Sequence, residues 1–241
     1  SFSRGVAAGR FTGGAGHIGA VPLKLSDAQG DWRYANNILD LKGGLQVADA
    51  LADPRFNPLV ANDFTLRFAD GRITAQGIAR EPKSQARVAD VQIAHVLASG
   101  TGHALLDVDG LTFGQQLQPE MLTTTTLGVI ANVAGTVNGR GRIDWTPQGV
   151  RSSGTFRTDG LNFAAAFGPV TGLKGEIAFS DLLGLMTPPG QSASVASINP
   201  GMAVVDGTVR YQLLPDRKIA IEGARWPFAG GELVLHPATL N

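Results

Sequence analysis

The stretch DFTLRFADGRITAQGIA, residues 63–79, decides the fold of this chain. From Phe64 to Phe68 apolar and polar residues alternate, and the same alternation returns in residues 72–76. Between the two runs stands Asp70-Gly71, a dipeptide that tolerates the positive φ of a tight hairpin turn. Period-two alternation on both sides of such a turn predicts two antiparallel strands with one apolar and one polar face.

The same pattern recurs along most of the chain and predicts an all-β fold. Residues 135–163 repeat the order of strand, turn glycine and strand, although no strict period of 20–50 residues emerges. A propeller or a leucine-rich solenoid is therefore disfavoured, and a long antiparallel meander is favoured. Further alternating runs cover residues 39–42, 91–96, 106–109, 140–145, 155–158 and 208–213, and further turn dipeptides stand at 109–110, 138–139, 159–160 and 206–207.

Only short helical segments interrupt this pattern. One is predicted from Gln118 to Leu127, weakened by four consecutive threonines, and another from Ser180 to Leu185, with Ser180 as its N-cap. The stretch TPPGQSAS, residues 187–194, is predicted to be a surface loop without regular structure, because two prolines lack donors and a glycine follows.

The composition excludes several classes of function. Charged residues make up 17% of the 241 residues, below the roughly 25% of an ordinary soluble domain. Lys plus Arg and Asp plus Glu are equal at 20 each, so no net field attracts nucleic acid. The absence of cysteine removes disulfides and thiol nucleophiles, and fits an oxidising compartment. No window is apolar enough to span a membrane, and the first residues lack the apolar core of a signal peptide.

Candidates for catalysis or metal binding are weak. The histidines are His17, His95, His103 and His236. His95 and His103 are expected in adjacent strands, where they could face one another, but no carboxylate stands at metal-ligand spacing. No G-x-S-x-G motif marks a serine nucleophile. We therefore expect no enzyme activity, no metal and no cofactor.

The stretch ARWPFAGGELVLHPATL, residues 224–240, places aromatic residues beside backbone breakers. Pro227 has no N–H, so it is expected at a sheet edge or strand entry, with Trp226 and Phe228 on one face. Gly230 and Gly231 then allow a bulge or sharp bend. Trp226 is expected either to fill a core or to line a groove.

Residues 168–240 carry a family resemblance. Their motifs are FSDLL (179–183), TPPGQ (187–191), INPG (198–201), DGTVRYQLL (206–214) and WPFAGG (226–231). In combination they resemble the YdbH-type family of AsmA-like proteins, once described as a dicarboxylate transport domain. Within the INPG motif, Asn199, Pro200 and Gly201 are expected to form a turn.

The resemblance implies a fold and a function. It implies one continuous AsmA-like sheet over residues 1–241, curled into an open trough (a β-taco), in a piece of a longer protein. Such proteins are similar to bridge-like lipid transporters of Gram-negative envelopes, which cross the periplasm from an inner-membrane anchor and carry phospholipid on an apolar inner face. Their partners are phospholipid, the remainder of their own chain and a small outer-membrane lipoprotein that extends the sheet by strand addition.

Parity assigns the residues that would line such a trough. A lipid can replace the second layer that a sandwich needs, and a strand of five or six residues covers the roughly 15 Å of one acyl chain. The assignment depends on register, because a one-residue slip would reverse every side chain. The expected lining residues are Leu66, Phe68, Ile73, Ile93, Val108, Ile143, Phe156, Val209, Ile219 and Leu233.

Two other functions stay open. One is a closed sandwich or solenoid, filled by its own side chains and used for adhesion or assembly. The other is binding of a small dicarboxylate, which requires a convergent pair of Arg or Lys in a pocket. Arg140 and Arg142 are the candidate pair for that pocket, although they share a strand face expected to be solvated.

Overall fold

A computed structural model describes residues 2–3, 5–17 and 21–240 and divides the chain into two compact units. Three strands, β8, β9 and β10, contribute residues to both units. Unit 1 comprises Ser1–Asp107, Met121–Thr124 and Arg142–Arg151, and unit 2 comprises Val108–Glu120, Thr125–Gly141 and Ser152–Asn241.

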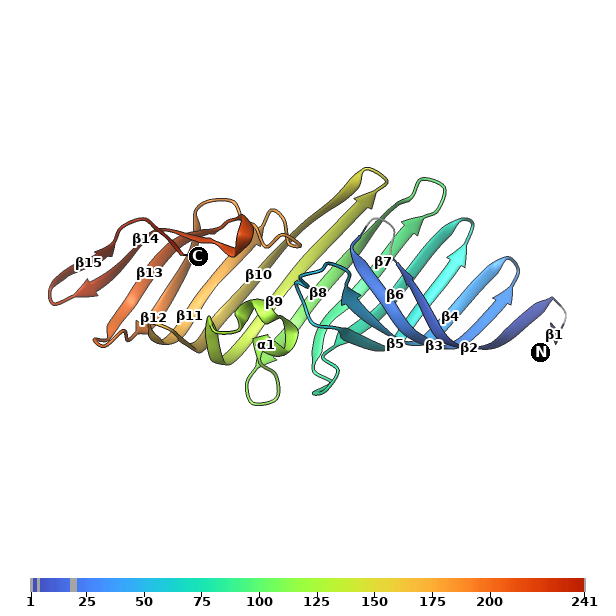
Figure 1. The fold of residues 1–241 in the computed structure, drawn as a ribbon, viewed down its shortest axis with the longest axis horizontal. Coiled ribbons are helices and arrows are strands. Elements are labelled where there is room, and N and C mark those ends of the chain that lie inside the picture. The colour runs from blue at the N-terminus through green and yellow to red at the C-terminus, as the bar shows by residue number, and fades with distance from the viewer. Residues whose placement is uncertain (1, 4, 18–20, 241) are drawn as a thin grey trace. The chain divides into compact units, whose positions relative to one another are not determined.

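Unit 1 is a single antiparallel layer in which each strand pairs with its neighbour in the sequence (Figure 1). The Asp70-Gly71 turn joins two of these strands, and both turn residues have positive φ as a two-residue hairpin requires. The strands are β1 (Phe2–Ser3), β2 (Val6–His17), β3 (Leu23–Ala35), β4 (Ile38–Asp49), β5 (Leu59–Ala69), β6 (Arg72–Arg80), β7 (Arg87–Val96) and the first part of β8 (Thr101–Phe113).

Unit 2 continues the same connectivity, and β16 pairs with β14 beside β15. Its helical turns are short: α1 (Pro119–Leu122), which both units share, η1 (Thr124–Thr126) at its border and η2 (Pro215–Arg217). Its strands are β9 (Ile130–Thr146), β10 (Gly149–Ala165), β11 (Gly168–Phe179), β12 (Gln191–Ile198), β13 (Val204–Leu213), β14 (Ile219–Phe228), β15 (Gly231–Leu235) and β16 (Ala238–Leu240).

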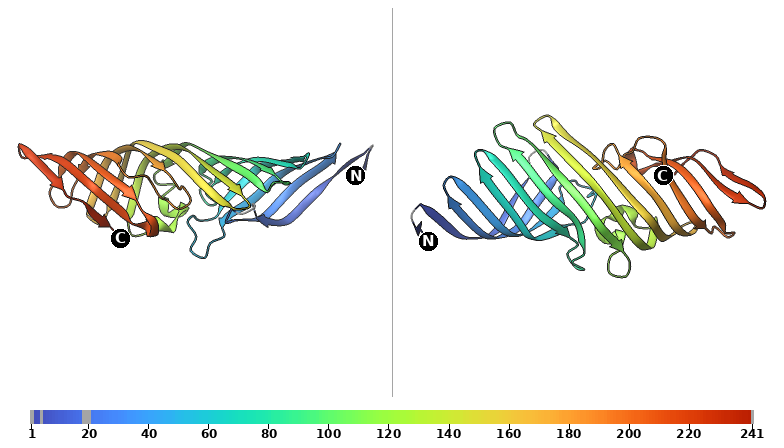
Figure 2. Two further views of the ribbon diagram at one scale, coloured as in Figure 1. Left: turned by 90° about the horizontal axis from the view of Figure 1, so that it is seen from above. Right: turned by 180° about the vertical axis from the view of Figure 1, so that it is seen from behind.

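The predicted all-β, open antiparallel meander is confirmed, and a closed module is not what forms. Strand order follows the sequence from β1 to β15 without closing on itself. Within the described residues, no second sheet lies against either unit (Figure 2). The alternative of a closed sandwich or solenoid filled by its own side chains is therefore wrong for this chain.

Two local predictions are wrong. Residues 180–185 form a turn closed by a bridge between Asp181 and Met186, because Asp181 Oδ1 accepts hydrogen bonds from Gly184 N (3.0 Å) and Ser152 Oγ (2.5 Å). Ser180 Oγ donates to Met186 O and caps no helix. The predicted loop 187–194 ends early, because β12 begins at Gln191, directly after the proline pair and Gly190.

Register shifts bend the strands of unit 1 along one line. The pairing slips between Phe11 and Gly14 in β2, between Ser26 and Gln29 in β3, and between Gly43 and Leu45 in β4. Such β-bulges increase twist and turn the strand direction. Gly30 and Gly43 face one another beside the shifts, and a β-carbon on either would overlap the backbone carbonyl of the facing strand.

We therefore predict that Gly43→Ala destabilises unit 1, lowering the free energy of unfolding by about 1–3 kcal/mol, because backbone cannot move aside as a flexible side chain can. Gly16→Ala is the matched control, since its β-carbon would meet nothing within 4 Å. The comparison is made by urea denaturation, and equal midpoints for the two variants would contradict the close approach.

Candidate functional site

Cross-strand register gives unit 1 one apolar and one polar face. Trp32 pairs with Leu41, and the same row continues through Leu66, Ala75 and Ile93. The next row on that face includes Leu39, Phe68 and Ile73. Between these rows lie residues that point to the other face, where successive side chains alternate; they are Arg33, Asp40, Arg67 and Thr74.

Unit 2 has an equivalent apolar face. Phe156 pairs with Ile177, and the Phe156 and Phe179 rings meet edge to face with centroids 5.9 Å apart. On the later strands the same face carries Val209 opposite Ala224, Leu213 opposite Ile219, and Trp226 opposite Leu233.

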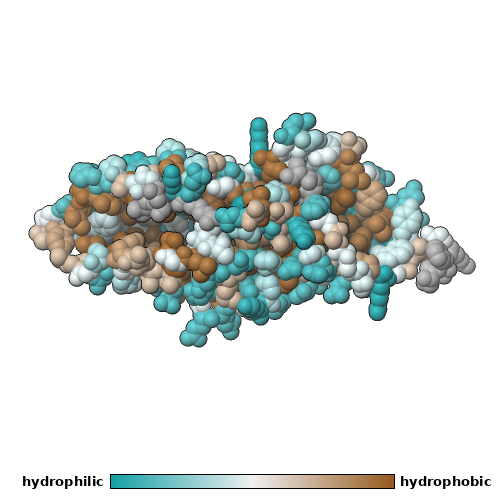
Figure 3. Space-filling view, in the orientation of Figure 1, coloured by the Kyte–Doolittle hydropathy of each residue, from teal (hydrophilic) through white to brown (hydrophobic). Residues whose placement is uncertain are grey.

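The apolar faces are only partly covered. The large side chains that are almost fully buried among the described residues are Trp145, Leu117 and Val170. By contrast, Leu66, Phe68 and Ile93 are half-buried, and Leu233 keeps 46% of its surface exposed. Figure 3 shows apolar surface gathered in patches, with polar side chains projecting around them. A folded sheet that leaves so many aliphatic side chains half-exposed has room for an apolar ligand in place of a second layer.

The ten predicted lining residues can now be placed. In unit 1, Leu66 and Ile93 share one row, and Phe68 and Ile73 share the next, while Ile143 is buried in β9. In unit 2, Phe156, Val209, Ile219 and Leu233 stand on strands of the apolar face, and Val108 is buried in β8. That any of them touches a lipid stays a proposal.

Trp226 belongs to a small core. It is 7% exposed and packs with Val204, Ala224, Ile198 and Val209.

The residues around Trp226 make a hairpin rather than a bend within a strand. Phe228 pairs with Gly231 across Ala229 and Gly230, which both have positive φ. Of the two expected alternatives, a bulge or a sharp bend, the bulge is therefore wrong, because Gly230 lies in a tight chain reversal and Gly231 begins the next strand. Pro227 lies beyond Arg225, where the ladder between β13 and β14 ends, so its missing N–H costs no bond to β13.

The residues of the INPG motif connect β12 to β13. Asn199 Oδ1 accepts a hydrogen bond from Gly201 N at 3.1 Å, which closes the turn around Pro200.

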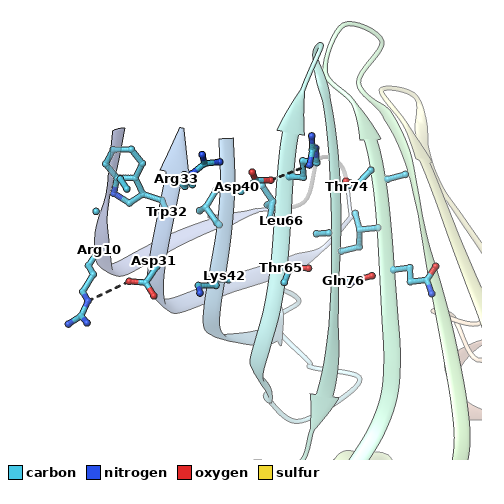
Figure 4. A pocket seen from close by; sticks show the side chains of 18 of the residues that line it. Arg10, Asp31, Trp32, Arg33, Asp40, Lys42, Thr65, Leu66, Thr74 and Gln76 are labelled. Carbon is cyan, nitrogen blue, oxygen red and sulfur yellow. Dashed lines mark ion pairs between the residues drawn. The ribbon is translucent and has the colours of Figure 1, made fainter. Parts of the chain in front are cut away.

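A separate cavity of about 1020 Å³ lies on the polar face of unit 1 (Figure 4). Its walls are two rows of polar residues that run across the strands, one containing Arg10 and Asp31 and the other Arg33 and Asp40. Its floor is the row between them, which runs across the strands from Gly9 in β2 to Ile93 in β7. Arg10 pairs with Asp31 at 3.5 Å and Arg67 with Asp40 at 3.8 Å, so cations and carboxylates alternate across strands. Sequence reasoning missed this cavity, because the charges align only once the register is known.

The remaining candidates for chemistry do not converge. His95 pairs with Gly102 and His103 with Ala94, so the two histidines point to opposite faces and the expectation that they could face one another is wrong. His95 Nδ1 accepts a hydrogen bond from Trp145 Nε1 at 3.1 Å. Within the described residues no group of His, Cys, Asp and Glu is arranged to hold a metal. Arg142 pairs with exposed Asp144, and neither Arg142 nor Arg140 lines the polar cavity.

Comparison with known families shows the family of the chain. The chain matches the family described as YdbH-like, intermembrane phospholipid transport protein YdbH, over residues 4–241. The chain belongs to the YdbH-like family. The resemblance carried by residues 168–240 thus extends over almost the whole chain. No match was found among curated proteins or among solved structures.

The description of the YdbH-like family names intermembrane phospholipid transport and not a known class of catalysis. No helix within residues 2–3, 5–17 and 21–240 is long and apolar enough to cross a membrane.

A buried ion pair fixes the loop between β4 and β5 in this YdbH-like chain. Asp49, whose side chain is fully buried, accepts hydrogen bonds from Arg55 Nε at 2.6 Å and Arg55 Nη2 at 3.0 Å. Asn57 N then donates to Leu122 O, and Thr123 Oγ1 donates to Arg55 O. Burial raises the pKa of Asp49, but the hydrogen bonds from Arg55 and Leu51 outweigh it and hold the pKa below its ordinary 3.8.

We predict that this loop undocks in acid. Because the folded pKa is lowered, the stabilisation is present above pH 3.8 and is lost as pH falls through the folded value. Asp49→Asn should lower the free energy of unfolding by about 2 kcal/mol at neutral pH and weaken the acid dependence. Urea titrations at neutral and acid pH measure both effects, with Asp70→Asn in an exposed turn as control. An unchanged acid dependence in Asp49→Asn would exclude the ion pair as its source.

Proposed function

We propose that this chain is a segment of an envelope-spanning protein that conducts phospholipids between the inner and outer membranes along its apolar faces. The observation that carries the proposal is the pair of half-exposed apolar sheet faces without a second layer, in a chain of the YdbH-like intermembrane phospholipid transport family. Transport on such a surface is passive and uses no cofactor.

Dimensions favour acyl chains as the ligand. Half of a bilayer's hydrocarbon core is about 15 Å, which is the length one tail must bury. β5 has 11 residues and so extends over roughly 36 Å at 3.3 Å per residue. A tail lying along one strand is therefore covered with length to spare, and each buried methylene contributes about 0.8 kcal/mol. The charged head group stays in water, so no cationic side chain has to be placed on the apolar face.

The proposal places the chain in the periplasm, as part of a longer protein anchored in the inner membrane. It also includes a small outer-membrane lipoprotein that adds a strand to the sheet. β15 supports this, because its Leu233, Val234 and Leu235 are all exposed. Within the described residues no strand pairs with its second edge.

Binding of a dicarboxylate has less support. The polar cavity of unit 1 does hold Arg10, Arg33, Lys42 and Arg67, but two of these face Asp31 and Asp40. Each exposed ion pair stabilises the protein little. The carboxylates of Asp31 and Asp40 nevertheless compete with any added carboxylate for Arg10 and Arg67.

The test uses charge placed on one face or the other. Phe68→Asp puts a carboxylate on the apolar face of unit 1, and Phe156→Asp does so in unit 2. Both variants should retain about tenfold less phospholipid than the parent chain, because a carboxylate resists transfer from water. Native mass spectrometry after incubation with vesicles of phosphatidylethanolamine and phosphatidylglycerol measures the retained lipid.

Thr65→Asp is the matched control, since Thr65 is exposed on the polar face of the same strand as Phe68. It should retain phospholipid like the parent chain. A parent chain that is folded and binds no phospholipid, or a Thr65→Asp variant that loses as much as Phe68→Asp, would overturn the proposal.

A further inference from the structure

Each of the three tryptophans lies against a glycine on the neighbouring strand. A β-carbon added at Gly9 would lie 3.0 Å from the Trp32 ring, and one added at Gly102 would lie 2.5 Å from the Trp145 ring. A β-carbon added at Gly207 would overlap atoms of the Trp226 ring. The same arrangement occurs in each unit, with Trp32 and Trp145 in unit 1 and Trp226 in unit 2. A facing glycine, which has no side chain, lets a ring of this size approach the sheet closely.

We call each of these glycine positions, against which a tryptophan ring lies, a seat. The seat at Gly207 has the closest approach of the three. A β-carbon there would overlap Trp226 Nε1, Cδ1 and Cε2, and no backbone atom is among its nearest neighbours. Alanine at this position therefore displaces the indole ring first, because ring atoms are the three nearest neighbours of the added β-carbon. Gly102 differs, because a β-carbon there would also meet Ala94 O at 2.6 Å.

The contact with Gly207 also hides the polar edge of the Trp226 ring. Trp226 Nε1 is buried and makes no hydrogen bond, which costs about 1–3 kcal/mol. Trp145 Nε1 is satisfied by His95 instead. Both rings are nearly inaccessible, at 7% and 1% exposure, while Leu233 opposite Trp226 is 46% exposed. Trp226 and Trp145 thus contribute little to the accessible apolar surface, whereas Trp32 is half-buried.

We propose that Gly207 and Gly9 determine how far Trp226 and Trp32 rise above the apolar faces, because the missing side chain lets each ring lie close to the sheet and leaves acyl chains room to pass over it. This inference rests on the proposed function. It deepens that proposal by naming glycines, which touch no ligand themselves, as the residues that keep the path open for acyl chains. The unmet hydrogen bond of Trp226 is the cost of keeping its N–H off that path.

A purely structural role predicts a different pattern. If the seat at Gly207 only completes the small core of Trp226, Val204 and Ala224, Gly207→Ala lowers the free energy of unfolding. Lipid binding by the folded molecules then stays unchanged. If the seats keep room for acyl chains above the tryptophan rings, Gly207→Ala reduces lipid binding even when the protein stays folded. Removing the ring should then restore binding despite the added methyl group.

The experiment compares Gly207→Ala, Trp226→Leu and the double variant with the parent chain. Retained phospholipid is measured by native mass spectrometry after incubation with phosphatidylethanolamine and phosphatidylglycerol vesicles, and the folded fraction by urea denaturation. We expect Gly207→Ala to bind about tenfold less lipid, Trp226→Leu to bind like the parent, and the double variant to match Trp226→Leu. Gly160→Ala is the control, because a β-carbon there meets nothing within 4 Å.

Each outcome is decisive. A folded Gly207→Ala variant that binds lipid like the parent overturns the inference, and so does a double variant that remains deficient. If Gly207→Ala does not fold, the same three-variant comparison at Gly9 and Trp32 decides, since that approach of 3.0 Å leaves the ring room to shift. A folded parent chain without phospholipid rejects the proposed function instead, and so is distinguishable from failure of the inference about Gly207 and Gly9.

Discussion

The constraint on which the rest of this structure depends is an apolar sheet face that, among the residues the structure describes, no second layer covers. Hydrophobic burial is worth about 25 cal/mol per Å² of apolar surface removed from water, and a single layer forgoes much of it. The sheet is therefore held mainly by its backbone ladders and by cross-strand side-chain pairs, as in the ladder from β2 to β8. A ligand that covers the apolar face supplies the missing burial, so stability and function draw on the same surface.

Side-chain hydrogen bonds compensate where the ladders are interrupted. At the register shift between β10 and β11, Asn162 Oδ1 accepts from Gly172 N at 2.8 Å, and Asn138 Oδ1 of β9 likewise accepts from Gly110 N of β8 at 2.8 Å. Both donor glycines have positive φ. The orphaned backbone groups of the bends thus find partners on the next strand. Bends fixed in this way are parts of the architecture, because they let strands of up to 17 residues change direction without losing their pairing.

The sequence alone predicts the alternation, the turn at Asp70-Gly71 and hence the meander, because these signals are local. It does not predict that Asp181 binds Ser152, a residue 29 positions earlier, which turns an apparent helix start into a closed turn. It also does not align Arg10 with Asp31 or Trp226 with Gly207, because those pairs exist only through the register. The lining residues were assigned by parity within each strand, and bulges that change parity cannot be read from one sequence.

The simple order of the strands has a consequence for how such a protein can change in evolution. Since each strand pairs almost only with its neighbours in the chain, gaining or losing one hairpin leaves every other pairing intact. Each hairpin adds about 10 Å across the strands, twice the spacing of neighbouring strands. Length is therefore an easily adjusted property of this architecture, because a duplicated hairpin lengthens the sheet and leaves every other strand with its own partners.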